Sequence, residues 1–356
     1  MHGSLTFDDY KILLSNHQII GNSNIFDQIQ PSSIDLTLSE ECYEIRSSFL
    51  SPKKLLRDKL KEIIINKIDL SKKKIFNKNK TYIVRLNEKL NLQQNIRGQC
   101  NPKRSTGRLD IFCRTIVNYS NEYEKIPLNY TGEIFLEITS RSFDIEFQAG
   151  DSLNQMRLVY FENNYIEDEL LIKINKRNTI IYDGKNNKII PKVNNGLRVS
   201  VDLSSKNEIS AYKAKKKTPI LIFNKKNYHN KNEFWIPINT ANNSIIIERN
   251  DFYILKSKEK IRIPANMAGE MIPYDTGIGD FRVHYAGFFD PGFGEPNGAF
   301  AVLEVKTNEV PFLIEDGQTI ARIKYEKLNK ESSVIYGKEM KSNYQDQKLT
   351  LSKHFI

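Results

Sequence analysis

Short segments in which apolar and polar residues alternate recur along this chain and are separated by turn residues. In the first half they span residues 33–38, 81–86, 132–138 and 143–147. Alternation with a period of two directs one side of a segment into a core and the other toward solvent, as in a β-strand. No long helical periodicity recurs between these segments, which disfavours a parallel α/β sheet. We expect an all-β fold, mainly β with short helices.

Two segments predict short helices. Thr6, followed three residues later by Asp9, has the form of a capping box and predicts a helix that ends near residue 16. Residues 51–80 are rich in lysine and predict an insertion between early strands. Its apolar residues indicate a small surface helix: Leu55, Leu56, Leu60 and residues 63–65. We expect this insertion to be a solvated decoration of the fold.

The order of segments occurs twice along the chain. The corresponding stretches are residues 30–36 (QPSSIDL) and 197–203 (LRVSVDL), 81–84 and 251–254, 132–138 (GEIFLEI) and 299–305 (AFAVLEV), and 148–153 and 315–320. Agreement of both period and order indicates two copies of one β-fold. The join lies in the polar residues 162–195. We therefore expect two domains, residues 1–175 and residues 176–356.

Composition changes this picture little but limits the function. A chain of 356 residues is long enough for two cores, and its net charge is +10 with a pI near 9.2. The lysine runs carry almost no aromatic residues, so we expect no nucleic-acid partner. The three cysteines, Cys42, Cys100 and Cys113, lack the C-x-x-C spacing of a zinc site or redox motif. With neither a signal peptide nor an apolar run of about 18 residues, we expect a cytoplasmic protein without a membrane partner.

The segment 102–108 (PKRSTGR) occurs in the first copy only. Guanidinium groups and hydroxyls bind phosphate oxygens, and a glycine lets backbone N–H groups approach a ligand closely. This phosphate grip, as we call residues 102–108, predicts a polyanion site. The second copy has residues 273–279 (PYDTGIG) instead, in which Asp275 would repel phosphate. We therefore expect the two copies to contribute different parts of one function.

Each copy carries a glutamate within an apolar strand. Glu137 lies in FLEI and Glu304 in VLEV. A carboxylate enters such a run when it has a partner or a chemical task. Either residue is thus a candidate catalytic group, or a structural one whose carboxylate caps a neighbouring loop. Asp290, in the stretch FDPG, is open to two interpretations as well, because Asp, Pro and Gly are also typical of an ordinary β-turn.

The signatures of several enzyme classes are missing from the sequence. Zinc-dependent nucleobase deaminases need H-x-E followed by P-C-x-x-C, and neither pattern occurs. There is no G-x-x-x-x-G-K-[ST] phosphate loop, no G-x-S-x-G elbow and no G-x-G-x-x-G fingerprint.

Taken in order, the segments 30–36, 102–108 and 287–293 (GFFDPGF), Tyr336, and the segment 342–347 (SNYQDQ) resemble the motifs of the dCTP deaminase family, within the dUTPase-like superfamily. With the repeat, the resemblance covers nearly the whole chain and fits the fused two-domain form. It implies two tandem dUTPase-like domains, each a distorted β-barrel or jelly roll. It also implies hydrolytic deamination of dCTP to dUTP and ammonia in pyrimidine deoxynucleotide (dUMP and dTTP) biosynthesis, with no zinc and with Mg²⁺ bound as the nucleotide complex.

The resemblance also implies roles for individual residues. These are phosphate binding by Arg104, Ser105 and Arg108; general-base catalysis by Glu137 or Glu304; nucleoside binding by Ala286 and Asp290; and closure of a carboxy-terminal lid by Tyr336 and Gln347. As general base, the glutamate would take a proton from water, and the hydroxide would attack C4 of cytosine. Asn343 stands where many relatives carry lysine.

Neither copy holds a full set of these residues. The first copy has residues 126–130 (IPLNY) in place of the Asp-Pro-Gly stretch, and the second lacks the phosphate grip. We expect a composite site, in which the grip serves the nucleoside residues of the second copy and Glu304. Single-domain relatives form trimers, so the resemblance leaves open a homo-oligomer, trimeric by analogy, or a monomer. In a uniform trimeric ring the grip would instead meet Glu137.

Two alternative functions remain at this point. One is a dUTPase, or a bifunctional enzyme that releases dUMP and pyrophosphate. The strand glutamates favour deamination, because dUTPases typically use an aspartate to activate water. The other is a catalytically silent nucleotide-binding regulator. The regulator is disfavoured because each expected motif is present once when the two copies are taken together.

Overall fold

The computed structural model describes residues 2–161, 164–204, 209–240, 242–272, 281–283 (backbone only), 287–307, 309–337 and 348–356. It divides into two compact units. Unit 1 comprises Met1–Asn164, Thr218–His229 and Leu328–Ser333. Unit 2 comprises Tyr165–Lys217, Asn230–Lys327 and Val334–Ile356.

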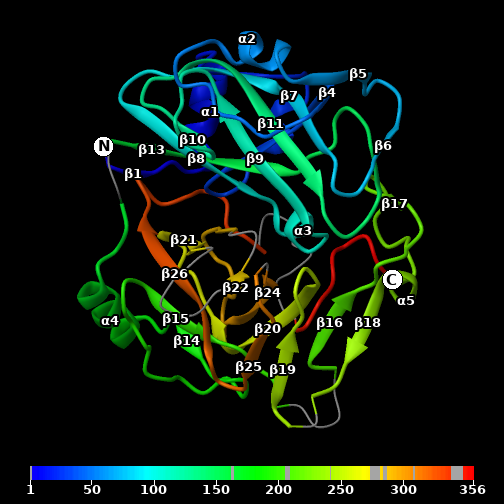
Figure 1. Ribbon diagram of the computed structural model, residues 1–356. Helices are drawn as coiled ribbons and strands as arrows, with labels where there is room; N and C mark the ends of the chain where they lie inside the picture. The colour runs from blue at the N-terminus through cyan, green and yellow to red at the C-terminus, as the bar shows by residue number, and fades with distance from the viewer. Residues whose placement is uncertain are drawn as a thin grey trace. The chain divides into compact units, whose positions relative to one another are not determined.

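Unit 1 is built mainly from strands (Figure 1). Its elements are β1 (Gly3–Ser4), α1 (Phe7–Ser15), β2 (Ile19–Ile20), the 3₁₀ helix η1 (Ile25–Gln28), β3 (Ile34–Leu36), β4 (Leu38–Ile45), α2 (Leu56–Lys61), β5 (Ile64–Asp69), β6 (Lys74–Phe76), β7 (Thr81–Asn91), β8 (Ile96–Pro102), α3 (Arg104–Gly107), β9 (Ile111–Val117), β10 (Lys125–Ile126), β11 (Thr131–Ser140), β12 (Ile145–Phe147), β13 (Asn154–Tyr160) and β17 (Leu221–Ile222). They form sheets of order β5-β4-β7-β11-β9, β1-β13-β8-β10 and β17-β12-β6.

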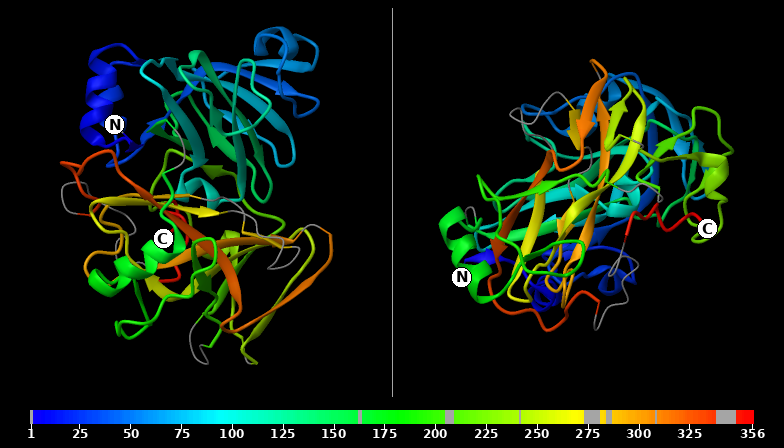
Figure 2. Two further views of the ribbon diagram at one scale, coloured as in Figure 1. Left: turned by 90° about the vertical axis from the view of Figure 1, so that its left-hand side faces the viewer. Right: turned by 90° about the horizontal axis from the view of Figure 1, so that it is seen from below.

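Unit 2 has a similar content of strands, and its helix α4 lies at the edge of the unit (Figure 2). Its elements are α4 (Asp168–Arg177), β14 (Ile181–Tyr182), β15 (Leu197–Ser200), β16 (Ala211–Ala214), α5 (Lys231–Phe234), β18 (Trp235–Ile238), β19 (Ser244–Ile247), β20 (Phe252–Ile261), β21 (Met267–Ile272), β22 (Phe281–Val283), β23 (Phe288–Phe289), β24 (Ala299–Thr307), β25 (Phe312–Glu315) and β26 (Thr319–Lys327). Their sheets have the orders β18-β16-β20-β24-β22, β15-β26-β21-β23 and β19-β25.

The two units repeat one topology, as the sequence predicts. The sheet β5-β4-β7-β11-β9 of unit 1 corresponds to β18-β16-β20-β24-β22 of unit 2, and β13-β8-β10 corresponds to β26-β21-β23. The short strands β2 and β14 also pair with equivalent partners, β7 and β20. The β-rich, tandem fold that we expected is confirmed.

Matching local contacts identify equivalent residues. The phenol oxygen of Tyr82 accepts a hydrogen bond from the backbone N–H of Asn77 at 3.1 Å, and that of Tyr253 accepts one from Glu248 at 3.2 Å. Tyr82 is thus equivalent to Tyr253, one position away from the correspondence that the sequence stretches 81–84 and 251–254 indicated. The shift arises because strand register is fixed by hydrogen-bonded partners rather than by side-chain similarity.

The amino-terminal helix agrees with our expectation, whereas the start of unit 2 does not. In α1 the capping box between Thr6 and Asp9 is present, as predicted. The polar residues 162–195 are more than a join, because they contain α4 and β14. The units divide after Asn164, whereas the boundary that we expected after residue 175 falls inside α4. The reason is that Leu171 of α4 is buried in the core of unit 2.

The insertion at residues 51–80 differs from our expectation. The small helix forms as α2, but Leu56 and Leu60 on it are buried, at 0% and 2% exposure. They pack with Ile83 and Phe135 of the β7–β11 sheet in one apolar cluster. The expectation of a solvated decoration was therefore wrong. Lysines on the exposed face of the insertion hid the apolar face that covers a sheet.

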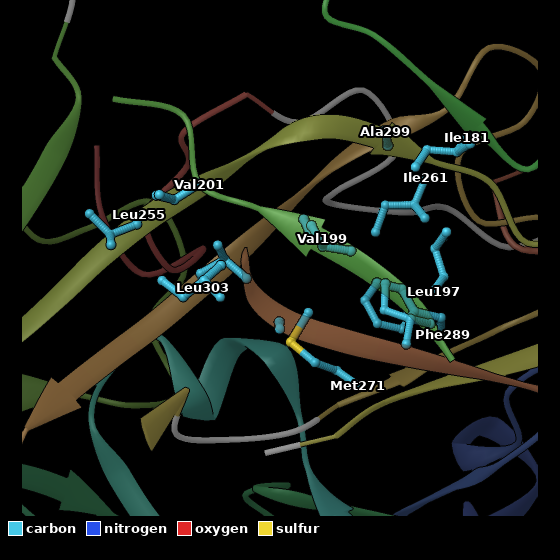
Figure 3. Close-up of a cluster of buried hydrophobic side chains, with 14 of the residues drawn as sticks. Ile181, Leu197, Val199, Val201, Leu255, Ile261, Met271, Phe289, Ala299 and Leu303 are labelled. Carbon is cyan, nitrogen blue, oxygen red and sulfur yellow. The ribbon is translucent and has the colours of Figure 1, made fainter. Parts of the chain in front are cut away.

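The core of unit 2 lies on one face of the β20–β24 sheet. Leu255 and Leu303, on neighbouring strands, point into it together with Val199, Val201 and Met271 (Figure 3). Residues that alternate with Leu255 and Leu303 therefore lie on the opposite face of the sheet. No helix in the described ranges has the length and apolar character needed to cross a membrane.

Candidate active site

The phosphate grip forms a tight turn in unit 1. Residues Arg104–Gly107 make the single-turn helix α3 between β8 and β9. Ser105 and Arg108 are almost fully buried, and Arg104 is half-buried. The turn is closed by the backbone N–H of Arg108, which donates to the carbonyl of Arg104 at 3.1 Å. The grip therefore brings the three predicted phosphate-binding residues together on one turn.

Contacts on both sides fix this turn in place. Ahead of it, the ammonium of Lys103 pairs with the carboxylate of Asp35, and its backbone N–H donates to Leu153 at 2.9 Å. Behind it, Asp110 accepts a hydrogen bond from the Ser142 hydroxyl at 2.6 Å. Lys103 is thus directed to an internal carboxylate, so the candidate phosphate ligands are the two arginines and Ser105.

Glu137 of β11 is 2% exposed and is held by neighbouring groups. Its Oε1 accepts hydrogen bonds from Nε and Nη2 of Arg114 at 3.1 and 2.5 Å, and its Oε2 accepts one from the Ser48 hydroxyl at 2.5 Å. The Arg114 guanidinium lies 3.7 Å from the centroid of the Tyr123 ring. The Tyr123 hydroxyl in turn lies 2.8 Å from Ser48 Oγ. Both oxygens of Glu137 are therefore engaged within unit 1.

Glu304 of β24 is also buried, at 5% exposure, but on a differently composed face. It lies opposite Ile254 of β20, and Leu303 and Val305 on either side of it point into the core of unit 2. Lys306, two residues further along β24, shares the face of Glu304 and is 5% exposed.

The two glutamates occupy equivalent positions in their sheets. Glu137 lies opposite Ile83, which lies opposite Tyr43. Glu304 lies opposite Ile254, which lies opposite Tyr212. The row Glu–Ile–Tyr is thus repeated across three strands in each unit, and differences between the two sites come from the groups around this row.

The loop that carries Asp290 has a counterpart in unit 1. The register of β10 on β8 equals that of β23 on β21, with Ile126 and Phe289 each opposite a glycine. The next residue is Pro127 in unit 1 and Asp290 in unit 2. The position of the carboxylate is therefore taken in unit 1 by a residue that can accept no hydrogen bond through its side chain.

Unit 1 also carries a buried carboxyl in this loop. The carbonyl of Glu124 accepts from the N–H of Cys100 at 2.8 Å, and that of Gly287 accepts from Met271 at 3.2 Å, which makes Glu124 equivalent to Gly287. The Glu124 carboxyl is enclosed and lies 3.4 Å from Asn154 Nδ2. Burial raises its pKa to about 8, because the charged form loses its hydration. Unit 1 thus has a carboxyl side chain at the position where unit 2 has Gly287.

Asp290 begins a turn to which Tyr336 is attached. Asp290 is 7% exposed, and its carbonyl accepts from the N–H of Phe293 at 3.1 Å. The backbone N–H of Tyr336 donates to the carbonyl of Pro291 at 2.9 Å. Gly292 has a φ of +89°, and a Cβ there would lie 2.1 Å from Ile335 Cγ2, so only glycine fits this approach. The structure thus brings Asp290 and Tyr336 together.

Several expected positions lie outside the described residues: Ala286, Gln347, Asp275 and Asn343.

Three neighbours of Glu137 were not identified from the sequence: Arg114, Ser48 and Tyr123. A charged residue inside the apolar strand 111–117 was the available signal for Arg114, but nothing in the pattern linked it to Glu137. Lys306, within the apolar strand of Glu304, carried a similar signal.

In the described part of the chain, no group of three or more His, Cys, Asp or Glu residues could hold a metal ion. The three cysteines are free and buried. Burial raises the pKa of the Cys100 and Cys113 thiols well above the ordinary value.

Comparison with known proteins covers both repeats. Residues 1–162 match the family model described as the 2'-deoxycytidine 5'-triphosphate deaminase (DCD) N-terminal domain, and residues 167–355 match the model of the C-terminal domain of the same enzyme. No match was found among curated protein sequences. Among solved structures, a 2'-deoxycytidine 5'-triphosphate deaminase from Agrobacterium tumefaciens is 36% identical, with a TM-score of 0.87 over 93% of this chain and 99% of that one. The chain therefore belongs to the 2'-deoxycytidine 5'-triphosphate deaminase family.

Proposed function

We propose that this protein deaminates dCTP hydrolytically to dUTP and ammonia, without zinc, and so supplies uracil deoxynucleotides for dUMP and dTTP synthesis. The observation that carries the proposal is the division of chemical groups between two units of one family fold. Unit 1 has the phosphate grip but Pro127 at the nucleoside position, and unit 2 has Asp290 and Glu304. The family membership over both units supports the substrate class.

In this proposal the grip binds the triphosphate. A triphosphate carries about four negative charges, and guanidinium groups bind its oxygens through charge-assisted hydrogen bonds. Arg104 and Arg108 supply the guanidinium groups and Ser105 a hydroxyl. Magnesium enters as part of the substrate, bound to the phosphates. Asp290 and the backbone of Ala286 are assigned to the sugar 3'-hydroxyl and the cytosine ring, and Tyr336 with Gln347 to closure over the nucleotide.

We assign Glu304, rather than Glu137, as the general base. Both oxygens of Glu137 accept short hydrogen bonds from Arg114 and Ser48. A water molecule would therefore have to compete with Arg114 and Ser48 for the oxygens of Glu137. Glu304 lies on β24, and the loop before β24 carries Asp290. The proposed base and the proposed nucleoside ligand therefore belong to one unit.

In the chemical step, Glu304 accepts a proton from water, and the resulting hydroxide forms a bond to C4 of the cytosine ring while the double bond between C4 and N3 opens. The proton passes from Glu304 to the amino nitrogen N4. The bond between C4 and N4 then breaks to release ammonia as the double bond between C4 and N3 re-forms, and a proton shift from the C4 hydroxyl to N3 gives uracil. Proton transfer by a positioned carboxylate accounts for about 10²–10⁴-fold of rate in typical enzymes.

A direct assay tests this function. Purified protein is incubated with dCTP and magnesium, and ammonia and uracil nucleotides are followed. We expect stoichiometric dUTP and ammonia. Intact dCTP would contradict the deaminase proposal and favour the nucleotide-binding regulator. Release of dUMP and pyrophosphate would indicate the bifunctional enzyme.

A further inference from the structure

The connection between β4 and β5 of unit 1 lies over the face of the sheet that carries Glu137. Leu56 of this connection, which spans residues 46–63, is fully buried in one apolar cluster with Ile83 and Phe135. Ile83 lies directly opposite Glu137, and Phe135 precedes Glu137 by two residues on β11, so both lie on the face of Glu137. The connection therefore packs on the side of the sheet toward which Glu137 points.

Ser48 of this connection contacts the carboxylate of Glu137 itself. Its hydroxyl donates to Oε2 of Glu137 at 2.5 Å and accepts a hydrogen bond from Nη2 of Arg114 at 2.5 Å. The Tyr123 hydroxyl lies 2.8 Å from Ser48 Oγ and donates to the carbonyl of Phe49 at 3.1 Å. Arg114 and Tyr123 thus fix both Ser48 and the chain after it against the carboxylate.

The place that Ser48 takes on Glu137 is the one that water needs at a general base. A base must accept a hydrogen bond from the water that it deprotonates. On Glu137 one oxygen accepts from the Ser48 hydroxyl and the other from Arg114. A reacting water at this position would have to displace Ser48 and, with it, a segment that Leu56 attaches to the sheet.

The corresponding connection of unit 2, between β16 and β18, takes a different course. Ser48 follows Tyr43 by five residues, and the residue five positions after the equivalent Tyr212 is Lys217. The next residues, Thr218–His229, belong to unit 1, where β17 pairs in parallel with β12. The Ser48 hydroxyl is therefore specific to unit 1, and most of the corresponding chain after β16 is not part of unit 2.

We propose that the β4–β5 connection permanently occupies the position in unit 1 that corresponds to the proposed catalytic site, with Ser48 in place of the reacting water. Each chain then binds one nucleotide, at Glu304, and unit 1 contributes its phosphate grip alone. This inference rests on the proposed function, which makes Glu304 the base. Pro127, at the position of Asp290, removes the nucleoside ligand of unit 1 as well.

Nucleotide stoichiometry tests the number of sites. Titration calorimetry of Glu304→Gln with magnesium dCTP should give one bound nucleotide per chain. Hydrogen exchange of residues 46–63 should be slow in the free protein and unchanged by the nucleotide, because this segment is held by bonds such as that from the Leu56 N–H to Asn118 Oδ1 at 2.8 Å. Two nucleotides per chain would overturn the inference. So would rapid exchange of residues 46–63 in the free protein.

Two neighbouring serines test the role of Ser48. Ser48→Ala should speed exchange across residues 46–63 by about tenfold or more, because a hydrogen bond to a charged group is lost. It should leave turnover of dCTP unchanged, since Ser48 lies outside the proposed catalytic machinery. Ser47 is the exposed neighbour, and Ser47→Ala should change neither quantity. Equal exchange in the two variants would show that Ser48 does not hold the connection in place.

The outcomes separate this inference from the proposed function. Intact dCTP and no bound nucleotide, together with slow exchange of residues 46–63, would contradict the proposed function alone. Formation of dUTP with two nucleotides bound per chain would contradict this inference alone.

Discussion

Glu137 in unit 1 and Glu304 in unit 2 occupy the same place in the same fold, yet their surroundings differ. Each begins a row that continues through isoleucine and tyrosine across neighbouring strands. Around Glu137, Arg114, Ser48 and Tyr123 form a closed hydrogen-bonded and stacked group. Around Glu304, the face combines apolar side chains with Lys306. The comparison teaches that a duplicated strand preserves the position of a carboxylate, whereas the surrounding segments decide which groups the carboxylate meets.

The insertion is part of the same difference. In unit 1, α2 and the chain before it cover the face of the sheet on which Glu137 lies, and Ser48 of that chain donates to Glu137. Arg57 of α2 forms ion pairs with Glu41 at 2.6 Å and Glu133 at 2.7 Å, which attach the helix to β4 and β11. The hydrogen-bonded pair with Arg57 lowers the pKa of Glu133, so this attachment is strongest above the acidic range.

The largest expected effect separates the two glutamates. Glu304→Gln should lower kcat for dCTP by about 10³-fold while dCTP still binds, because glutamine cannot accept the proton from water. Glu137→Gln keeps the shape and its hydrogen-bond acceptor, and should lower kcat by less than about tenfold. Steady-state kinetics with a direct binding measurement checks both. If only Glu137→Gln abolished turnover, the assignment of the base would be reversed.

The next prediction weakens the packing of α2 on the sheet of unit 1. Leu56→Ala should lower the free energy of unfolding by about 2–5 kcal/mol, because it leaves a cavity under α2. Its neighbour Leu55 is 46% exposed, so Leu55→Ala is the matched control and should change stability by less than about 0.5 kcal/mol. Denaturant unfolding measures both. Equal small effects would mean that α2 does not seal this face of the sheet.

The phosphate grip offers a comparison between adjacent cations. Arg104→Met should raise KM for dCTP by about 10–100-fold, since a charge-assisted hydrogen bond to phosphate is worth roughly 1.5–3 kcal/mol. Lys103→Met is the control: its ammonium is paired with Asp35, so KM should change by less than about threefold. A larger effect from Lys103 than from Arg104 would remove the proposed division of roles within residues 102–108.

A pH-dependent effect on stability is expected from the carboxyl that unit 1 has where unit 2 has Gly287. The pKa of Glu124 is about 8 in the folded state against an ordinary value of 4.5. Between these values the folded state keeps a proton that the unfolded state has released, so stability falls as pH rises, by up to about 1.4 kcal/mol per pH unit. Glu124→Gln should remove this slope between about pH 5 and 8 in denaturant unfolding. Parallel slopes in both proteins would show that Glu124 is ionised when folded.

Much of this architecture is local information and could be predicted. The capping box of Thr6 and Asp9 lies within four residues, and the β-strands follow from alternation with a period of two. The repeat was visible because both copies retain the order of their strands and turns. The motif at residues 102–108 and the Asp-Pro-Gly turn at Asp290 are contiguous in sequence, and they identified the family. Features formed by residues close together in the chain can therefore be predicted from the sequence.

The rest depended on residues far apart in the chain. Alternation places Glu137 on one face of a strand, but it cannot say that Ser48, 89 residues away, donates to it. The same limit hid the burial of Leu56 beneath a lysine-rich surface. The sequence showed residues 126–130 in place of the Asp-Pro-Gly stretch, but only the strand register shows that Pro127 takes the position of Asp290.

The sequence by itself determined the strands, the duplication, the phosphate grip and two candidate bases. Only the tertiary structure decided that Arg114 holds one glutamate and that Lys306 shares a buried face with the other. The physical reason is that strand pairing sets which distant side chains share a face, and so which charged groups surround each carboxylate.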